Sequence, residues 1–404
     1  MQMHTPHGAS HRPWLHLMDA PLRPLFFGAA LAALEGMAMW LAELNGMATP
    51  RGHLGPFWHL HEMMFGYVAA AMGGFLLTAV PGWTDTAPLS GRPVALLAGL
   101  WLLGRVAVWL PGLPSGVVAA CDLAFLTALT VALAIPVGRT GGLRSNVVVP
   151  VLAIMAVANL LWHLQTAGFA TAPAGIALAL GMTVFAMTYI GGRIIPHFTH
   201  RVTMREIPER PWLDAACNGS VLVWAVLHTA LPGGTWSATA ALLAALANGM
   251  RLAGWLHPRA LTCALTWVLH AASVWLVTGL LLTAGADFGL LPPGAGIHGL
   301  TVGAIGLMTL GVMSRAALGH TGRVVTAPAG MGVAFALVFT AALVRVGLPL
   351  AAGHLYGVAL NLSGLLWMAG FGIYLWVYTP ILLGPEPRAA EESALPRAGG
   401  RGQV

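Results

Sequence analysis

The sequence predicts an all-α, polytopic membrane protein with about twelve transmembrane helices. Of its 404 residues, 57% are hydrophobic and 8% are charged, whereas a soluble domain carries roughly 25% charged residues. The apolar segments are about twenty residues long, which is the length that crosses the hydrocarbon core as a helix. Barrel strands would be half as long and would alternate in polarity. Helices are therefore expected throughout.

The expected helices follow one another with short polar connections. They cover about residues 24–43, 59–80, 93–110, 116–136, 147–168, 173–192, 212–231, 236–254, 261–284, 295–313, 327–348 and 354–378. We expect an N-terminal tail over residues 1–23, a single twelve-helix transmembrane domain over residues 24–380 and a C-terminal tail over residues 381–404. The last tail is rich in Pro, Gly, Glu and Arg, a composition that favours disorder.

The arginines predict the orientation of this bundle. All 19 basic residues are arginine, and sixteen of them fall on one side of the expected topology. Arg51 lies in a loop on the other side, and Arg105 and Arg345 lie inside helices. The positive-inside rule makes the crowded side cytoplasmic, with both termini inside. Loop arginines thus serve as a topology signal, and no nucleic-acid partner is expected. The three cysteines form no C-x-x-C motif, so they indicate neither a zinc site nor a disulfide framework.

Internal echoes suggest a repeat. The stretch 96–110 resembles 242–256, and the expected third helix, with Arg105, resembles the eleventh, with Arg345. A three-fold repeat of four-helix units would fit these echoes. Apolar low-complexity runs also align by chance, so both explanations stay open.

Histidines gather at the ends of the expected helices that face away from the arginine-rich side. The group comprises His59, His61, His163, His228, His298 and His354. Imidazole is the commonest metal ligand and the usual axial ligand of haem b. His59 and His61 lie about 200° apart around a helix, so they cannot both face one metal unless the helix start is irregular. A glycine follows both His61 and His298 by five residues, at Gly66 and Gly303.

Other ionisable residues inside the expected helices are functional candidates by default. Glu35, Glu62 and Asp122 are either neutral acids bonded to a neighbouring helix or proton carriers for a metal site. Arg105 and Arg345 either extend towards the interface or hold haem propionates in a bidentate manner. His270 is expected deeper in the membrane than the other histidines.

Several long motifs resemble the NnrS family. They are Trp58 to Gly66, Gly74 to Thr84, Leu161 to His163, Gly192 to Thr199, Trp267 to His270 and Ser314 to Arg323. The resemblance implies a twelve-helix bacterial inner-membrane protein that contains haem, also binds copper, and takes part in denitrification and defence against nitric oxide. The matching histidines are His59, His61, His163, His270, His298 and His320.

The architecture also resembles, more faintly, the catalytic subunit of haem-copper oxidases and nitric oxide reductases. The run from His61 to Phe75 looks like the second helix of that family. The chain departs from it by lacking paired histidines on the seventh helix and by carrying one histidine on the tenth. A standard copper site of that type is therefore in doubt.

Together these patterns suggest an enzyme that reduces nitric oxide to nitrous oxide within the membrane. His61 and His298 would be the axial ligands of one haem b, and His59, His163 and His270 would serve a second metal or the open face of the haem. Glu62 and Glu35 would pass protons, and Arg105 and Arg345 would hold propionates.

The absence of a C-x-x-C-H motif means that electrons must come from an external donor. The alternative is a haem- or copper-binding sensor or transporter of nitric oxide without turnover.

Overall fold

The computed structural model describes residues 16–47, 57–140 and 147–387, and within these ranges it is helical and contains no strand. Of the predicted tails, residues 1–15 and 388–404 lie outside this description, as does Arg51. The long α-helices are α1 (Leu22–Leu44), α3 (Ala69–Thr84), α4 (Arg92–Trp109), α5 (Ser115–Thr140), α6 (Val148–Leu164), α7 (Ala172–Thr203), α8 (Pro211–Ala230), α9 (Thr235–Trp255), α10 (Ala264–Asp287), α12 (Gly306–Gly319), α13 (Met331–Ala351) and α14 (Tyr356–Leu383).

These helices confirm the predicted all-α membrane architecture, with 12 helices in the described part of the chain. Ten of the helical segments are both long and apolar enough to cross a membrane. The remaining two are α8 and α9, which carry more polar side chains. Asp214 on α8 and Arg251 on α9 form an ion pair of 3.2 Å between Oδ1 and Nη1. Because the two charges satisfy each other, these helices can still lie inside the bundle.

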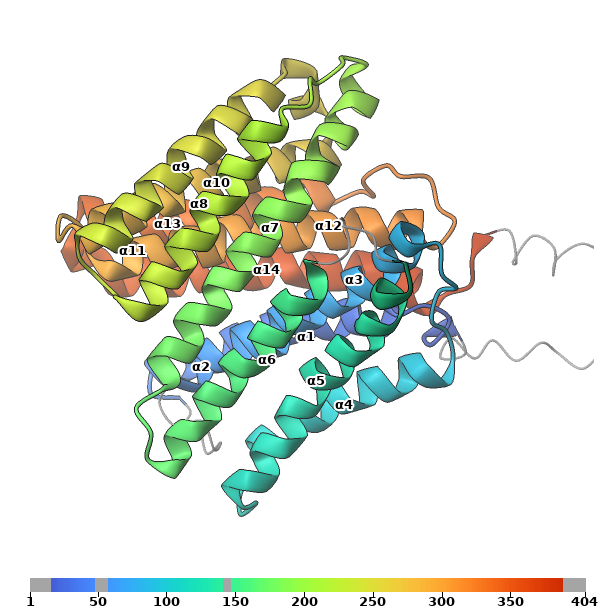
Figure 1. Cartoon of the computed structure of the whole chain (residues 1–404), viewed down its shortest axis with the longest axis horizontal. Coiled ribbons are helices and arrows are strands. Elements are labelled where there is room, and N and C mark those ends of the chain that lie inside the picture. Colours follow the sequence, from blue (N-terminus) through green and yellow to red (C-terminus); the bar gives the residue numbers. More distant parts are fainter. Residues whose placement is uncertain (1–15, 48–56, 141–146, 388–404) are drawn as a thin grey trace, which may run out of the picture.

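Most helices that follow one another in the chain pack side by side, with α3 and α4 as an exception, and α14 closes the bundle by packing against α1. In Figure 1, α4, α5 and α6 lie at the bottom of the view and α8, α9 and α10 at the top. Between them, α3 packs against α1, α5 and α12. We call the end of the bundle where α1 begins and α14 ends the terminal end, and the opposite end, where α2 and α11 begin, the histidine end. The three-fold repeat remains a prediction.

Five helices in the described residues run through an internal proline and past their expected ends, and α3 and α7 illustrate this. The second span was expected to end near Val80, but α3 runs through Pro81 to Thr84. The sixth was expected to end at residue 192, but α7 runs through Pro196 to Thr203. Membrane helices tolerate proline because neighbouring groups satisfy the freed carbonyl.

In two spans, a π-helical segment follows a histidine that ends a short α-helix. The short helix α2 (Trp58–His61) leads into the π-helix η3 (Glu62–Val68), and α11 (Pro293–His298) leads into the π-helix η6 (Gly299–Ile305). Runs of i→i+5 hydrogen bonds are rare in proteins and are frequent at functional sites. Their recurrence at the two stretches with the histidine-to-glycine spacing makes these segments candidates for the functional region.

Candidate functional site

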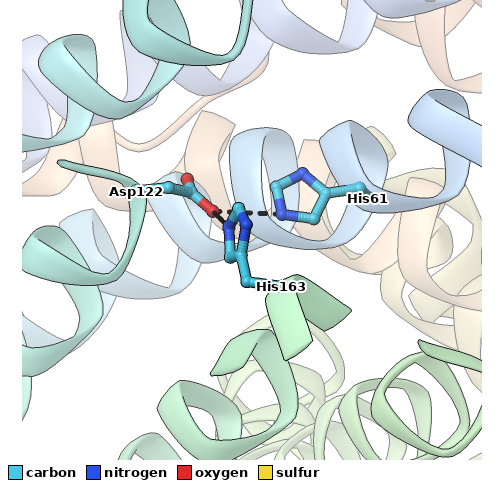
Figure 2. Close-up of side chains that lie close together, drawn as sticks. All are labelled: His61, Asp122 and His163. Atoms are coloured by element: carbon cyan, nitrogen blue, oxygen red, sulfur yellow. Dashed lines mark hydrogen bonds and ion pairs between the residues drawn. The ribbon is translucent and has the colours of Figure 1, made fainter. Parts of the chain in front are cut away.

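Three side chains from three helices converge inside the histidine end. His61 comes from α2, Asp122 from α5 and His163 from α6, and all three are buried. One ligand atom from each lies within 4.8 Å of the other two, an arrangement that can hold a metal ion. Figure 2 shows both imidazoles directed at the Asp122 carboxylate. The Asp122 Oδ2 atom is 3.0 Å from His61 Nε2 and 2.8 Å from His163 Nε2.

Asp122 is the acceptor on which the surrounding groups meet. Its Oδ2 also accepts a hydrogen bond of 2.9 Å from Asn159 Nδ2, and its Oδ1 accepts one from Arg105. The same guanidinium donates to Glu62 Oε1, which in turn is 3.0 Å from His61 Nδ1. A carboxylate on the second nitrogen of a histidine is the usual way in which proteins orient a metal-binding imidazole.

The charges of this cluster do not balance. With neutral imidazoles, the single positive charge of Arg105 faces the two negative charges of Glu62 and Asp122, which leaves one negative charge in excess. A net charge buried away from water is costly. A proton on a histidine or a bound cation would cancel the excess, so the cluster is built to take up one of the two.

From the sequence, Asp122 was expected to be a neutral acid or a proton carrier and not a metal ligand, and Asn159 was not expected in the site. Asn159 precedes His163 by four residues, which places both side chains on the same face of α6. This four-residue spacing from His163 could have identified Asn159 as a site residue from the sequence. Nothing in the sequence indicated that α5 would bring Asp122 to the same point.

His59 lies in a different environment from His61. Its ring stacks on Trp40 of α1 with 4.8 Å between the ring centroids and 14° between the planes. The buried Nδ1 atom of His59 has no hydrogen-bond partner among the described residues. The two histidines therefore face different sides of the span, as their angular separation of about 200° predicts.

His298 lies near His59, whereas the sequence led us to expect it opposite His61. Its Nδ1 donates to the Gly294 carbonyl at 2.7 Å, which leaves the lone pair of Nε2 available as a ligand. Both His59 and Arg345 are near enough to act electrostatically on the His298 imidazole. Arg345 donates to the Tyr356 hydroxyl at 3.2 Å. In the described residues, no hydrogen bond or ring contact joins His298 to His61.

The remaining predicted site residues lie elsewhere. Glu35 is exposed on α1. His270 was expected at mid-membrane, but it lies near the start of α10, where Nδ1 is bonded to the Thr266 carbonyl at 3.0 Å. His320 follows α12 at the terminal end, where its side chain is exposed, and partial desolvation lowers the pKa of its imidazole. Arg105 does not extend to the interface, and it is not free to bind a propionate, because it is paired with Glu62 and Asp122.

Comparison with known proteins agrees with this architecture. The sequence model of the NnrS protein family matches residues 16–386, which include every described transmembrane helix up to the end of α14. Among curated proteins, none matches the chain. The matching family is associated with nitric oxide metabolism and, in general, with metals and haem. This multi-pass membrane protein, with its buried His61–Asp122–His163 group, belongs to the NnrS family.

Proposed function

We propose that this protein reduces nitric oxide to nitrous oxide at a metal and haem site in the histidine end of the bundle. The observation that carries the proposal is the buried His61–Asp122–His163 group and its one excess negative charge. A metal cation bound there would supply both a Lewis acid and, if it is copper or iron, a one-electron centre. The arginine distribution supports a periplasmic position for this end, with both termini in the cytoplasm of a bacterial cell.

The donor set fits a small divalent ion. Two imidazoles and one carboxylate suit copper, iron or zinc. The observed separations of 3.0 and 2.8 Å from Asp122 Oδ2 are short for ligands of a shared metal. Two donors of a tetrahedral metal at about 2.1 Å are roughly 3.4 Å apart. An opening of about half an ångström would therefore admit the ion. Asn159 and Glu62 would remain as outer partners that orient Asp122 and His61.

The second part of the site fits haem through His298 and His59. Each ring has a nitrogen without a hydrogen-bond partner among the described residues, and Arg345 stands near both for a propionate. His61 was expected to be the partner of His298. Its two ring nitrogens are already engaged by Glu62 and by Asp122 with Asn159. His61 lies with Asp122 and His163 and makes no hydrogen bond or ring contact with His298 among the described residues, so we propose His298 and His59 as the haem ligands and assign His61 to the metal that it would share with Asp122 and His163.

Proton supply is the role proposed for the carboxylates. Joining two nitric oxide molecules forms one N–N bond, breaks one N–O bond and releases the oxygen as water, which consumes two protons and two electrons from an external donor. Glu62 touches both His61 and Arg105, so its carboxylate lies beside the proposed metal ligands, where it would hold and release a proton. Nitric oxide partitions into the lipid bilayer and needs no polar channel to reach the site.

The test is anaerobic nitric oxide consumption by the purified protein with a reductant, together with its reduced optical spectrum and metal content. We expect turnover, a haem band and bound metal. His298→Ala should abolish the haem band and retain the metal, whereas His61→Ala should lose the metal. The matched control is His228→Ala at the same end, because His228 faces Ser237 and Asp287 and should keep both groups.

Two outcomes would contradict the proposal. A haem band with bound nitric oxide but without turnover would make the protein a sensor. A preparation that contains neither haem nor metal after expression with both available would remove the basis for any redox function.

A further inference from the structure

A groove outside this site runs along three helices. Figure 1 shows α3 and α12 side by side in the middle of the bundle, with α7 crossing them obliquely. At the level of the π-helices, α7 packs against both η3 and η6. Farther towards the terminal end, a space of about 600 Å³ lies between α7 and the other two helices. We call this space the α7 groove.

The lining of the α7 groove is apolar and flexible. Four methionines contribute to it, together with aliphatic and aromatic side chains: Met72, Met187, Met308, Met313, Phe75 and Ile194. Methionine fills irregular spaces and adapts to flexible partners. Several lining side chains, among them Met72, Phe75 and Val312, are partly exposed. The groove is therefore open to lipid and closed to polar solutes over this length.

The groove continues to the terminal end and becomes basic there. A second space of about 630 Å³ shares Phe75, Ile194 and Val312 with the first and adds Arg201, Arg315 and His320. From Ile305 to Gly319, the helix rise of 1.5 Å per residue corresponds to roughly 20 Å. One leaflet of a bilayer has a hydrocarbon depth of about 15 Å. The combined groove thus spans one leaflet from its headgroup level to the membrane centre.

Its two arginines have no acidic partner. Neither Arg201 nor Arg315 forms an ion pair within the described part of the chain, although the two are close enough to act on each other electrostatically. The Arg315 guanidinium lies over the Phe198 ring, with Cζ 3.6 Å from the ring centroid, which holds its plane and leaves its N–H groups free. Two neighbouring guanidiniums without an acidic partner, Arg201 exposed and Arg315 partly buried, favour the binding of an anion between them.

We infer that the α7 groove binds an anionic phospholipid, with its phosphate between Arg201 and Arg315 and one acyl chain along α3 and α12. The charge of the groove favours this occupant over a zwitterionic lipid, whose own cationic group would face the two arginines. Its length and apolar lining favour a lipid over a free phosphate, which would leave the methionine-lined part empty. His320 also lines this part of the groove and can add a hydrogen bond to the headgroup.

Native mass spectrometry of the full chain can test this inference, with phosphatidylglycerol and phosphatidylcholine as the two probes. We expect one tightly held phosphatidylglycerol and at least tenfold weaker retention of phosphatidylcholine. Arg315→Gln should weaken phosphatidylglycerol binding about tenfold, because it removes one charge-assisted contact. Arg92→Gln is the matched control, since Arg92 is exposed at the start of α4.

A second variant tests the acyl-chain part without changing any charge. Gly191 lines the groove, and a Cβ added there would meet only side chains, at 3.4 Å from Ile195 and 3.8 Å from Met308. Gly191→Leu should therefore fill the groove and weaken lipid binding at least tenfold. Gly99→Leu, at a glycine with open space around it, should leave binding unchanged.

Three results would overturn the inference. Equal retention of both lipids would show that the arginines do not select the headgroup. Unchanged binding in Gly191→Leu would show that the chain lies elsewhere. Loss of haem from Arg315→Gln, with lipid retention unaffected, would assign the basic end to a propionate.

Discussion

The spans Trp58–Thr84 and Pro293–Gly319 begin with the same backbone pattern, but their histidines lie in different surroundings. In both, a histidine closes a short α-helix, a π-helix of 7 residues follows, and a glycine lies within that π-helix. His61 then enters a cluster of charged and amide groups. His298 donates a hydrogen bond to the Gly294 carbonyl and has His59 and Arg345 nearby, without any carboxylate partner among the described residues.

Gly66 and Gly303 explain how the same π-helical backbone can lie against two different sets of side chains. A Cβ at Gly66 would lie 3.1 Å from Arg105 Nη1 and 3.3 Å from Glu62 Oε2. A Cβ at Gly303 would lie 2.4 Å from the Trp275 ring. The first glycine makes room for a guanidinium and the second for an indole. The neighbouring helices, and not the π-helices themselves, therefore determine the chemistry at each histidine.

The largest effect is expected from removing the charge that distinguishes the first span. Asp122→Asn would leave Arg105, His61 and His163 without their common anionic acceptor. We expect the loss of bound metal and a decrease of about 3–5 kcal/mol in the free energy of unfolding. Chemical unfolding in detergent and elemental analysis would measure the two effects.

Asp287→Asn is the control for this change. Asp287 lies at the end of α10, where it accepts from Ser237 at 2.5 Å. It is outside the metal cluster, so the metal content should be unchanged. If Asp122→Asn retains the metal and full stability, the charged cluster is not what separates the two spans.

An intermediate effect is expected from exchanging the glycines for alanine. In Gly303→Ala, the new Cβ meets a rigid indole ring, and overpacking of this kind costs about 1–3 kcal/mol. In Gly66→Ala, the contacts are with the ends of flexible side chains, so the loss of stability should be smaller. The melting temperatures of the two variants in the same detergent would show the order. The reverse order would mean that Arg105 is held more rigidly than Trp275.

The smallest effect is expected at the end of the second span. Although the side chain of His320 is exposed, partial desolvation of its imidazole lowers the pKa below the ordinary value of 6.5, so only a small effect on stability is expected. The unfolded chain then binds a proton near this pH that the folded chain does not, so stability is present above pH 6.5 and declines as the pH falls below it. His320→Gln should flatten this decline in a series of melting curves. If the melting temperature of the unmodified protein and that of His320→Gln depend on pH in the same way, this prediction is wrong.

The architecture could be predicted because membrane insertion depends on local properties. Segment length and apolar content were sufficient to identify the helices, since a span such as Met331–Ala351 must satisfy its own backbone hydrogen bonds in lipid. The ends of α3 and α7 could not be predicted in this way. Whether Pro81 or Pro196 ends a helix depends on the groups packed beside it.

The sequence by itself determined which residues were available as ligands and on which span each one lies. Histidines and carboxylates in an apolar chain are costly, so their presence alone marked His59, His61, His163 and His298 as candidates. Only the tertiary structure decided which of them meet. Two residues separated by 61 positions, His61 and Asp122, come within 3.0 Å because α2 and α5 cross there. The same packing turns His59 towards Trp40 and His298, since neighbouring positions on a helix face different partners.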